Sequence, residues 1–386
     1  MPIDPILNGE AKLLISKLFI GLVCLLFSFN SHAQTPILED KSAVDSLKKA
    51  TEHIYNYRFD QSDVIINRLK VKYGNHPGIV LLSCISQFWR NFPIGAKPKE
   101  FAAYEKMLGQ VLVLSDKMKA KYPNSPEPVF YEMMANLILA RHHSEMGEYI
   151  RAVNETRKAF PLIKKGFSLK STYADFYFST GMYNYYREAF PENHPMYKPF
   201  TVFFTEGNKA LGLKELEIAS QKAIFCRAES YIFLSMIHLR DLYNIPTSLK
   251  YATQLHESFP GNWLFAMNYA ECLIESRKFD NAEPIVNRLL SRNEPSALQA
   301  GFYLKGLIEK GENRPESART NFAKSISYGG KSKDRLSKGF FGLCYNELGK
   351  LAKEDGKTEA AKKFFRLALE NCAFKKVKED AKRAGY

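Results

Sequence analysis

A short pattern of packing residues returns at a nearly constant interval in the second half of the chain. Each copy has a small residue, an apolar residue four positions later and another packing residue three positions after that. The copies are Gly212/Leu216/Ala219, Ser248/Ala252/Leu255, Ala282/Val286/Leu289, Ala318/Phe322/Ser325 and Ala361/Phe365/Ala368, and their first members lie 36, 34, 36 and 43 residues apart. An interval of this size indicates stacked copies of one supersecondary unit, since a single unit leaves its apolar face in water.

A second helical stretch precedes each of the last three copies and carries a small residue near its middle. These small residues are Ala270, Gly306 and Gly342, and the first two come twelve positions before the next copy of the pattern. A position without a bulky side chain lets two helices cross at a short distance. The pattern therefore predicts pairs of antiparallel helices that touch at these small residues.

This arrangement resembles the tetratricopeptide repeat, which has two antiparallel helices, a small residue where they cross, and a proline or glycine after the second helix. The resemblance implies a right-handed α-solenoid. Extending the pattern through the less regular first half predicts about eight antiparallel helix pairs, and residues 374–385 (FKKVKEDAKRAG) are expected to cap the stack as a final helix. No convincing alternation of strand type is found, so the expected fold class is all-α.

The pattern divides the chain into four expected regions. They are an export signal at 1–33, degenerate helix pairs at 34–170, an irregular pair at 171–222, and a regular array with its capping helix at 223–386. In the irregular pair, Gly212 follows the small residue Gly181 by 31 positions instead of twelve. We therefore expect an insertion at about 190–208 that divides the protein into two lobes near residue 200.

The irregular pair is rich in aromatic and proline residues. Three aromatic residues are expected to pack between helices: Tyr173, Phe176 and Tyr177. Three more are expected to pack back against the solenoid, because an apolar loop should not remain in water: Phe200, Phe203 and Phe204. The segments GMYNYYREAFPENHP and TEGNKALGLKELEIA resemble the tetratricopeptide-repeat-39 group and its uncharacterised bacterial relatives over about residues 170–260, and this likeness implies no catalytic residues.

The first 33 residues have the features of an export signal. Lys12 and Lys17 precede an apolar run from Leu18 to Phe29, and Ala33 completes a cleavage site. The run is too short to be read as a membrane span, so none is expected after cleavage. The residues before Cys24 lack the small residue that lipoprotein processing requires. The expected location is therefore periplasmic or secreted, without a lipid anchor.

The remaining cysteines and the net charge limit the disulfides and the kinds of partner to be expected. Five cysteines follow residue 33, an odd number with wide spacing and no CxxC, which favours buried free thiols over a disulfide framework. The net charge of +14 is spread along the helical segments. This charge has two possible interpretations. It belongs to an ordinary solvated helix surface, or it attracts an anionic polymer of the envelope as a partner. Export makes nucleic acid an unexpected partner.

The sequence contains one local group with metal-ligand character, His142 and His143 with Glu145. Adjacent residues on a helix point about 100° apart, so these two histidines do not share an ion as an i, i+4 pair does. The common motifs of hydrolases, zinc peptidases and nucleotide-binding proteins are absent. We therefore expect no metal, no cofactor and no enzymatic activity. The remaining enzymatic alternative is a site beside the insertion, at Arg187, Glu188 and His194.

Helical repeat arrays present an extended concave surface to their ligands. The resemblance implies that the first helix of each pair lines this surface, at positions three before, one after and four after the small crossing residue. The partner-binding candidates among these positions are Phe178, Tyr185, Arg240, Glu271, Tyr303, Lys310 and Asn346. Tyrosine and arginine often anchor interfaces. Several neighbouring positions are apolar, which leaves open whether the surface is free or is partly filled by segments of the chain itself.

The expected function is that of an exported, non-enzymatic scaffold that binds a peptide or protein partner in the cell envelope. The alternative is a glycan- or nutrient-binding component of the envelope, because stacked aromatic faces suit sugars. The identity of the partner does not follow from a repeat pattern.

Overall fold

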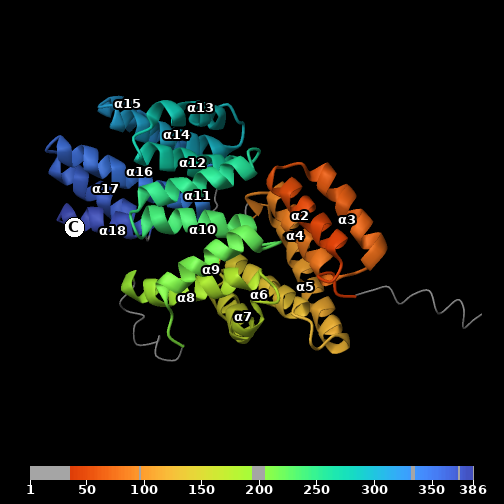
Figure 1. The fold of residues 1–386 in the computed structure, drawn as a ribbon. Coiled ribbons are helices and arrows are strands. Elements are labelled where there is room, and N and C mark those ends of the chain that lie inside the picture. Colours follow the sequence, from red (N-terminus) through yellow and green to blue (C-terminus); the bar gives the residue numbers. More distant parts are fainter. Residues whose placement is uncertain (1–34, 95–96, 194–204, 332–334, 373, 386) are drawn as a thin grey trace, which may run out of the picture.

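The computed structural model describes residues 35–94, 97–193, 205–331, 335–372 and 374–385. These residues form seventeen helices and no strand (Figure 1). The helices follow one another as antiparallel neighbours in an α-solenoid. The expected all-α fold class is confirmed.

Eight helix pairs and one final helix make up the described chain. The pairs are α2 (Lys41–Tyr55) with α3 (Phe59–Tyr73), α4 (Pro77–Arg90) with α5 (Pro98–Lys121), α6 (Glu127–Glu145) with α7 (Tyr149–Leu169), α8 (Phe176–Asn193) with α9 (Lys209–Lys222), α10 (Arg227–Arg240) with α11 (Ile245–Ser258), α12 (Trp263–Glu275) with α13 (Phe279–Leu290), α14 (Pro295–Gly311) with α15 (Pro315–Gly329), and α16 (Arg335–Glu354) with α17 (Thr358–Asn371). The final helix is α18 (Lys375–Arg383). The predicted number of pairs and the predicted final helix are therefore confirmed.

The turn inside a pair has one recurrent geometry. A residue with positive φ ends the first helix in six pairs: Tyr57, Gly147, Tyr243, Arg277, Asn313 and Gly356. In the α12–α13 turn, the amide of Lys278 donates to the carbonyl of Leu273, five residues earlier. The same spacing recurs between Arg314 and Glu309 in the next pair. Such bonds satisfy carbonyls at a helix end and reverse the chain within a few residues, which sets the second helix antiparallel to the first.

The residues of the repeated pattern lie at the contacts between paired helices. All fifteen members of the five copies are buried. A Cβ added to Gly306 would lie 2.6 Å from the ring of Phe322, and one added to Gly342 would lie 2.1 Å from the Cβ of Cys372. Larger side chains would force the helices apart. The small residues thus mark the helix crossings, as the pattern predicts.

The insertion between α8 and α9 begins later than the expected residue 190. Helix α8 continues to Asn193, and the predicted contacts of Phe200, Phe203 and Phe204 lie outside the described residues, as does His194. The end of the connection is held against α8, because the hydroxyl of Tyr183 donates to the carbonyl of Thr205 at 2.8 Å. Tyr173 and Phe176 are buried, as expected of residues between helices.

The buried apolar side chains form two large clusters that meet near residue 263, and neither cluster is bounded near residue 200. One cluster of buried apolar side chains runs from Ile37 to Phe265 and includes residues of both α8 and α9. A second cluster runs from Trp263 to Val377. The lobe boundary expected at the insertion is therefore wrong, since Phe178 of α8 and Leu216 of α9 belong to one continuous core. Close packing at Gly181 and Gly212 joins the two helices despite the long connection.

Both ends of the described chain return to the middle of the solenoid. Near the N-terminal end, the ring of Tyr55 packs against Phe259 and Phe265, at centroid distances of 5.3 and 5.8 Å. Asn56 accepts a hydrogen bond from the amide of Gly261 at 3.1 Å. At the other end, α18 lies beside α16 and α17 and also reaches α10 and α12 (Figure 1). Both ends of the described chain therefore pack against inner helices of the solenoid.

Candidate functional site

None of the seven predicted partner-binding residues is fully exposed. Five side chains are almost entirely buried: Phe178, Tyr185, Glu271, Tyr303 and Asn346. The other two are largely covered, with 18% of the Arg240 side chain and 25% of the Lys310 side chain exposed. The described chain itself fills the surface that the pattern assigns to a partner.

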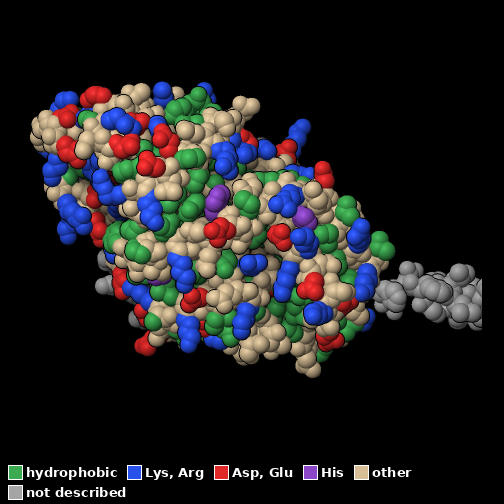
Figure 2. Space-filling model, turned by 45° about the horizontal axis from the view of Figure 1, so that its top comes forward, with side chains coloured by type: hydrophobic (Ala, Val, Ile, Leu, Met, Phe, Trp, Pro, Cys, Tyr) green, Lys and Arg blue, Asp and Glu red, His purple; other side chains and the backbone are tan. Residues whose placement is uncertain are grey.

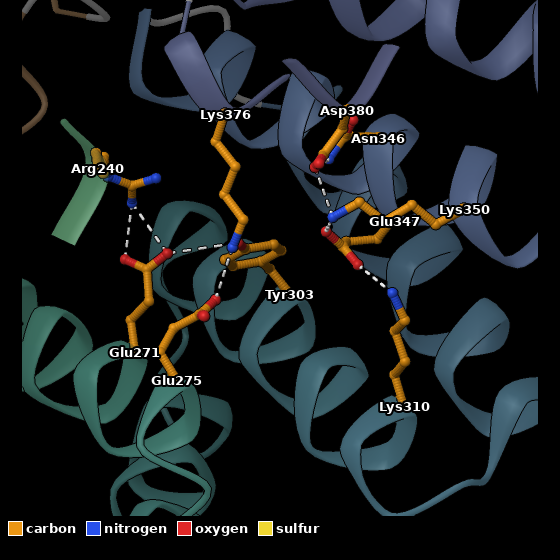
Figure 3. A network of polar contacts seen from close by, with 10 residues as sticks. All are labelled: Arg240, Glu271, Glu275, Tyr303, Lys310, Asn346, Glu347, Lys350, Lys376 and Asp380. Atoms are coloured by element: carbon orange, nitrogen blue, oxygen red, sulfur yellow. Dashed lines mark hydrogen bonds and ion pairs between the residues drawn. The ribbon is translucent and has the colours of Figure 1, made fainter. Parts of the chain in front are cut away.

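Five of the seven lie together on one face of four neighbouring helices. We name the face formed by α10, α12, α14 and α16, on which α18 lies, the first-helix face. Its predicted members are Arg240, Glu271, Tyr303, Lys310 and Asn346 (Figure 3). The four helices are adjacent because each is the first helix of a successive pair.

The first part of this face is an ion pair between two predicted residues. The Nη2 atom of Arg240 lies 3.0 and 2.7 Å from the two carboxylate oxygens of Glu271. The hydroxyl of Tyr303 donates to Glu271 Oε1 at 3.4 Å, and the Arg240 guanidinium lies 4.8 Å from the ring centroid of Phe374. Burial opposes the charge of Arg240, but Glu271 together with neighbouring groups such as Tyr303 outweighs it, and the pKa of the guanidinium is raised.

The second part is a chain of charged side chains from α14 to α18. Glu347 accepts from Lys310 at 2.8 Å and from Lys350 at 2.6 Å. Lys350 also lies 2.7 Å from Asp380 of α18, which accepts from the amide of Asn346 at 2.8 Å. Burial raises the pKa of Glu347, but the two lysines lower it more, and the resulting pKa is about 2. The carboxylate is therefore charged at any ordinary pH.

Helix α18 lies on the first-helix face and contributes further polar contacts to the network. Lys376 Nζ lies 3.1 Å from Glu275 of α12 (Figure 3). Lys375 Nζ donates to the carbonyl of Asp241 at 3.5 Å. The hydroxyl of Tyr243 donates to Glu379 at 2.9 Å. These contacts join α18 to residues more than 100 positions earlier. The helix thus does more than cover the last pair.

Two predicted residues lie elsewhere, in the first core cluster. Phe178 packs against Phe233 at a ring-centroid distance of 5.8 Å. Tyr185 is buried, and its hydroxyl donates to Asp241 at 3.4 Å. Burial raises the pKa of the Tyr185 phenol well above its ordinary value. The structure therefore assigns both side chains to packing between helices and does not bring them into the charged network.

Sequence reasoning missed several residues of the network. They are Glu275, Glu347, Lys350, Phe374, Lys376 and Asp380. One signal was present: Glu275 lies four positions after Glu271, on the same face of its helix. Glu347 likewise directly follows the predicted Asn346. The position of α18 across this face leaves no comparable signal, because its contacts join distant parts of the chain.

The histidine pair on α6 is held by contacts within the protein. The ring of His142 is buried beside Tyr104 and Phe101, at centroid distances of 5.0 and 5.5 Å. Burial lowers its pKa to about 4. His143 Nδ1 lies 2.8 Å from a carboxylate oxygen of Glu148. Within the described residues, no three His, Cys, Asp or Glu side chains are placed to hold a metal ion.

Two carboxyl groups, Glu229 and Asp175, join distant parts of the chain near the start of α10. The hydroxyl of Tyr55 donates to Glu229, whose second carboxylate oxygen is buried without a hydrogen-bond partner. Burial raises the pKa of Glu229 to about 7. Nearby, Asp175 accepts from the backbone amides of residues 224–226. Asp175 is fully buried and Glu229 is partly buried, and both hold distant segments together.

The surface grooves and charges do not indicate a second site. One groove of about 500 Å³ lies between α15, α16 and α17, beside Tyr345 and Phe364. Another, of about 560 Å³, lies between α2 and α3. Neither contains a predicted partner-binding residue. On the face shown in Figure 2, Lys and Arg side chains are mixed with Asp and Glu and form no single basic patch.

Across the described helices, none is both long and apolar enough to span a membrane. No protein-family model matches the chain, and no curated protein matches it.

Proposed function

We propose that this protein is an exported, non-enzymatic scaffold of the tetratricopeptide type that binds a segment of a protein partner on its first-helix face. The observation that carries the proposal is the polar character of this face. Arg240, Glu271, Lys310 and Asn346 come from four successive first helices, yet they lie in one network with a bound helix. Contacts between packed helices are mostly apolar, and charged side chains are rarely buried unless they are paired.

The helix pairs support the assignment to the tetratricopeptide type. The turn geometry recurs within six pairs, and small residues lie where paired helices cross. The small residues at the crossings are one of the features on which the resemblance rests. The finer likeness of residues 170–260 to the tetratricopeptide-repeat-39 group stays a prediction, and so does export through residues 1–33, which lie outside the described residues.

The chemistry of the first-helix face suits a peptide. Arginine and tyrosine provide strong contacts when they are covered by a partner, and charge-assisted hydrogen bonds orient a bound segment. Glu271, Glu275 and Glu347 present carboxylates, whereas Lys310 and Lys350 present ammonium groups. A helical segment placed on this face finds apolar contacts flanked by charges, which is a recurrent mode of peptide recognition.

The proposal is tested by placing a photo-crosslinking amino acid at Leu307, a half-buried position of the first-helix face on α14. The matched control has the same amino acid at Leu369, which is 41% exposed on α17. After irradiation in envelope extract, we expect adducts with a second protein from position 307 and not from position 369. Equal adducts at both positions, or only internal crosslinks at 307, would contradict the proposal.

A further inference from the structure

We propose that the first-helix face is a receptor for a lysine-rich amphipathic helix preceded by an aromatic residue, and that α18 occupies it as an intramolecular ligand. The inference rests on the proposed function and specifies its partner. A protein that binds this face would carry a segment with the chemistry of α18 and would exchange with it.

The start of the α18 segment shows what the face recognises first. The ring of Phe374 lies under the guanidinium of Arg240, at 4.8 Å, and packs against the second core cluster. A cation above an aromatic face gains electrostatic attraction, and more so when both groups are shielded from water. Arg240 is held in place for this contact by Glu271. The face therefore offers a position for an aromatic side chain.

The next two residues show a preference for positive charge. Lys375 donates to the carbonyl of Asp241, which follows the C-terminus of α10, and Lys376 pairs with Glu275 near the C-terminus of α12. Helix C-termini carry unpaired carbonyls and a partial negative charge, which attract cations. The two consecutive lysines thus contact the C-terminal ends of two different helices, α10 and α12.

The remaining contacts fix the orientation of the bound helix. Val377 and Ala381, four residues apart on one side of α18, are buried. Asp380 lies between them and contacts Asn346 and Lys350. The opposite side carries Lys382 and Arg383, which are exposed. The recognised pattern is an aromatic residue, two lysines, an apolar residue, an acidic residue three positions later and then a small residue.

The length of α18 makes exchange feasible. The helix has nine residues, and isolated helices of this length are marginal in water. Its helical form therefore depends on the first-helix face. Because α18 is tethered to that face, its effective concentration is on the order of mM, and a partner in solution must compete with it. Loosening α18 should then increase the affinity for an added copy.

The test uses a fluorescent synthetic peptide of residues 374–385 and the full chain. The variant Lys376→Glu/Asp380→Lys exchanges two charges of α18 without altering the receptor face or the net charge. Its matched control, Lys382→Glu/Glu370→Lys, exchanges two charges whose side chains are exposed. We expect the peptide to bind the first variant at least tenfold more tightly than the control or the wild type. A peptide carrying the same exchange as the first variant should not bind.

Equal binding to all three chains, or no binding to the first variant, would overturn the proposal. If that variant does not fold, hydrogen exchange on the wild type tests the proposal instead. The amides of α18 must exchange at least tenfold faster than those of α10 to α17, and equal protection would refute the inference. Peptide binding without a crosslinked partner at position 307 would leave the receptor intact and reject the proposed function. A crosslinked partner without peptide binding would reject only the α18-like chemistry.

Discussion

Arg240 of α10 and Glu271 of α12 form an ion pair with each other on the first-helix face, with Nη2 lying 3.0 and 2.7 Å from the two carboxylate oxygens. Both residues occupy positions that the repeat pattern predicts for the partner-binding surface. Their pairing shows that both side chains lie on one face of the solenoid, where their nearest partners are other residues of the same chain.

Removing one member of this pair should cost more than removing an exposed ion pair. Arg240→Ala leaves the Glu271 carboxylate buried without its cation, and we expect a loss of about 3 kcal/mol in the free energy of unfolding. Arg366→Ala is the control, because Arg366 and Glu370 are largely exposed and 4.0 Å apart. Its expected cost is about 0.5 kcal/mol or less. Urea unfolding followed by circular dichroism measures both, and equal losses would argue against a structural role for the Arg240 pair.

The buried Glu229 should make stability fall as pH rises. Its pKa in the folded protein is about 7 because of burial, above the ordinary value of 4.5. Between these values the unfolded chain releases the proton while the folded chain retains it. The stabilising contribution of the protonated carboxyl is complete below pH 4.5 and is lost as pH rises through 7. Glu229→Gln should therefore be more stable than the wild type at pH 8, by roughly 3 kcal/mol.

At pH 4.5 the same variant should match the wild type within about 1 kcal/mol, since the carboxyl is then neutral. Urea midpoints at both pH values measure the effect. Comparing variant with wild type cancels the titration of buried histidines such as His142. Glu316→Gln is the control, because 86% of the Glu316 side chain is exposed, and its difference from the wild type should not change with pH. A pH-independent difference for Glu229→Gln would show that Glu229 titrates normally.

Two glycines of α16 should respond oppositely to the same substitution. A Cβ at Gly342 would lie 2.1 Å from the Cβ of Cys372, so Gly342→Ala should destabilise the protein by about 1 to 3 kcal/mol. A Cβ at Gly339 would meet nothing within 4 Å, and Gly339→Ala should stabilise the helix by about 0.5 to 1 kcal/mol. Thermal unfolding of the two variants checks this. Equal shifts would contradict the close crossing of α16 and α17.

The five described cysteines should resist thiol reagents in the folded protein. All are buried and free: Cys84, Cys226, Cys272, Cys344 and Cys372. Burial raises the pKa of Cys272 to about 11 and that of Cys344 to about 12, so little thiolate is present at neutral pH. We expect modification roughly a hundredfold slower than in denaturant. Mass spectrometry of maleimide adducts measures this, and rapid modification of any one in native conditions would reveal a local opening.

Local periodicity was sufficient to predict the helix pairs. Positions such as Ala282, Val286 and Leu289 repeat because each second helix packs against its own first helix, a contact between residues close in the chain. Gly306 and Gly342 could likewise be assigned to helix crossings, since a close approach excludes larger side chains. The buried free state of the cysteines also followed from their number and spacing.

The candidate site was only partly predictable. Glu271, Lys310 and Asn346 were assigned to one face because that face follows from helix register. Their partners were not, since Asp380 and Lys376 come from a helix that returns from the end of the chain. Tyr185 has the same position relative to its small crossing residue, but it lies in the first core cluster, between α8 and α10.

The sequence by itself determined the all-α class, the eight pairs and the small residues at their crossings, because these depend on contacts within about one repeat. Only the tertiary structure decided that the two core clusters meet near Trp263 and that α18 covers the first-helix face. Small rotations between neighbouring pairs add up along a solenoid, and their sum determines which distant segments meet. Such a sum leaves no periodic signal in the residues themselves.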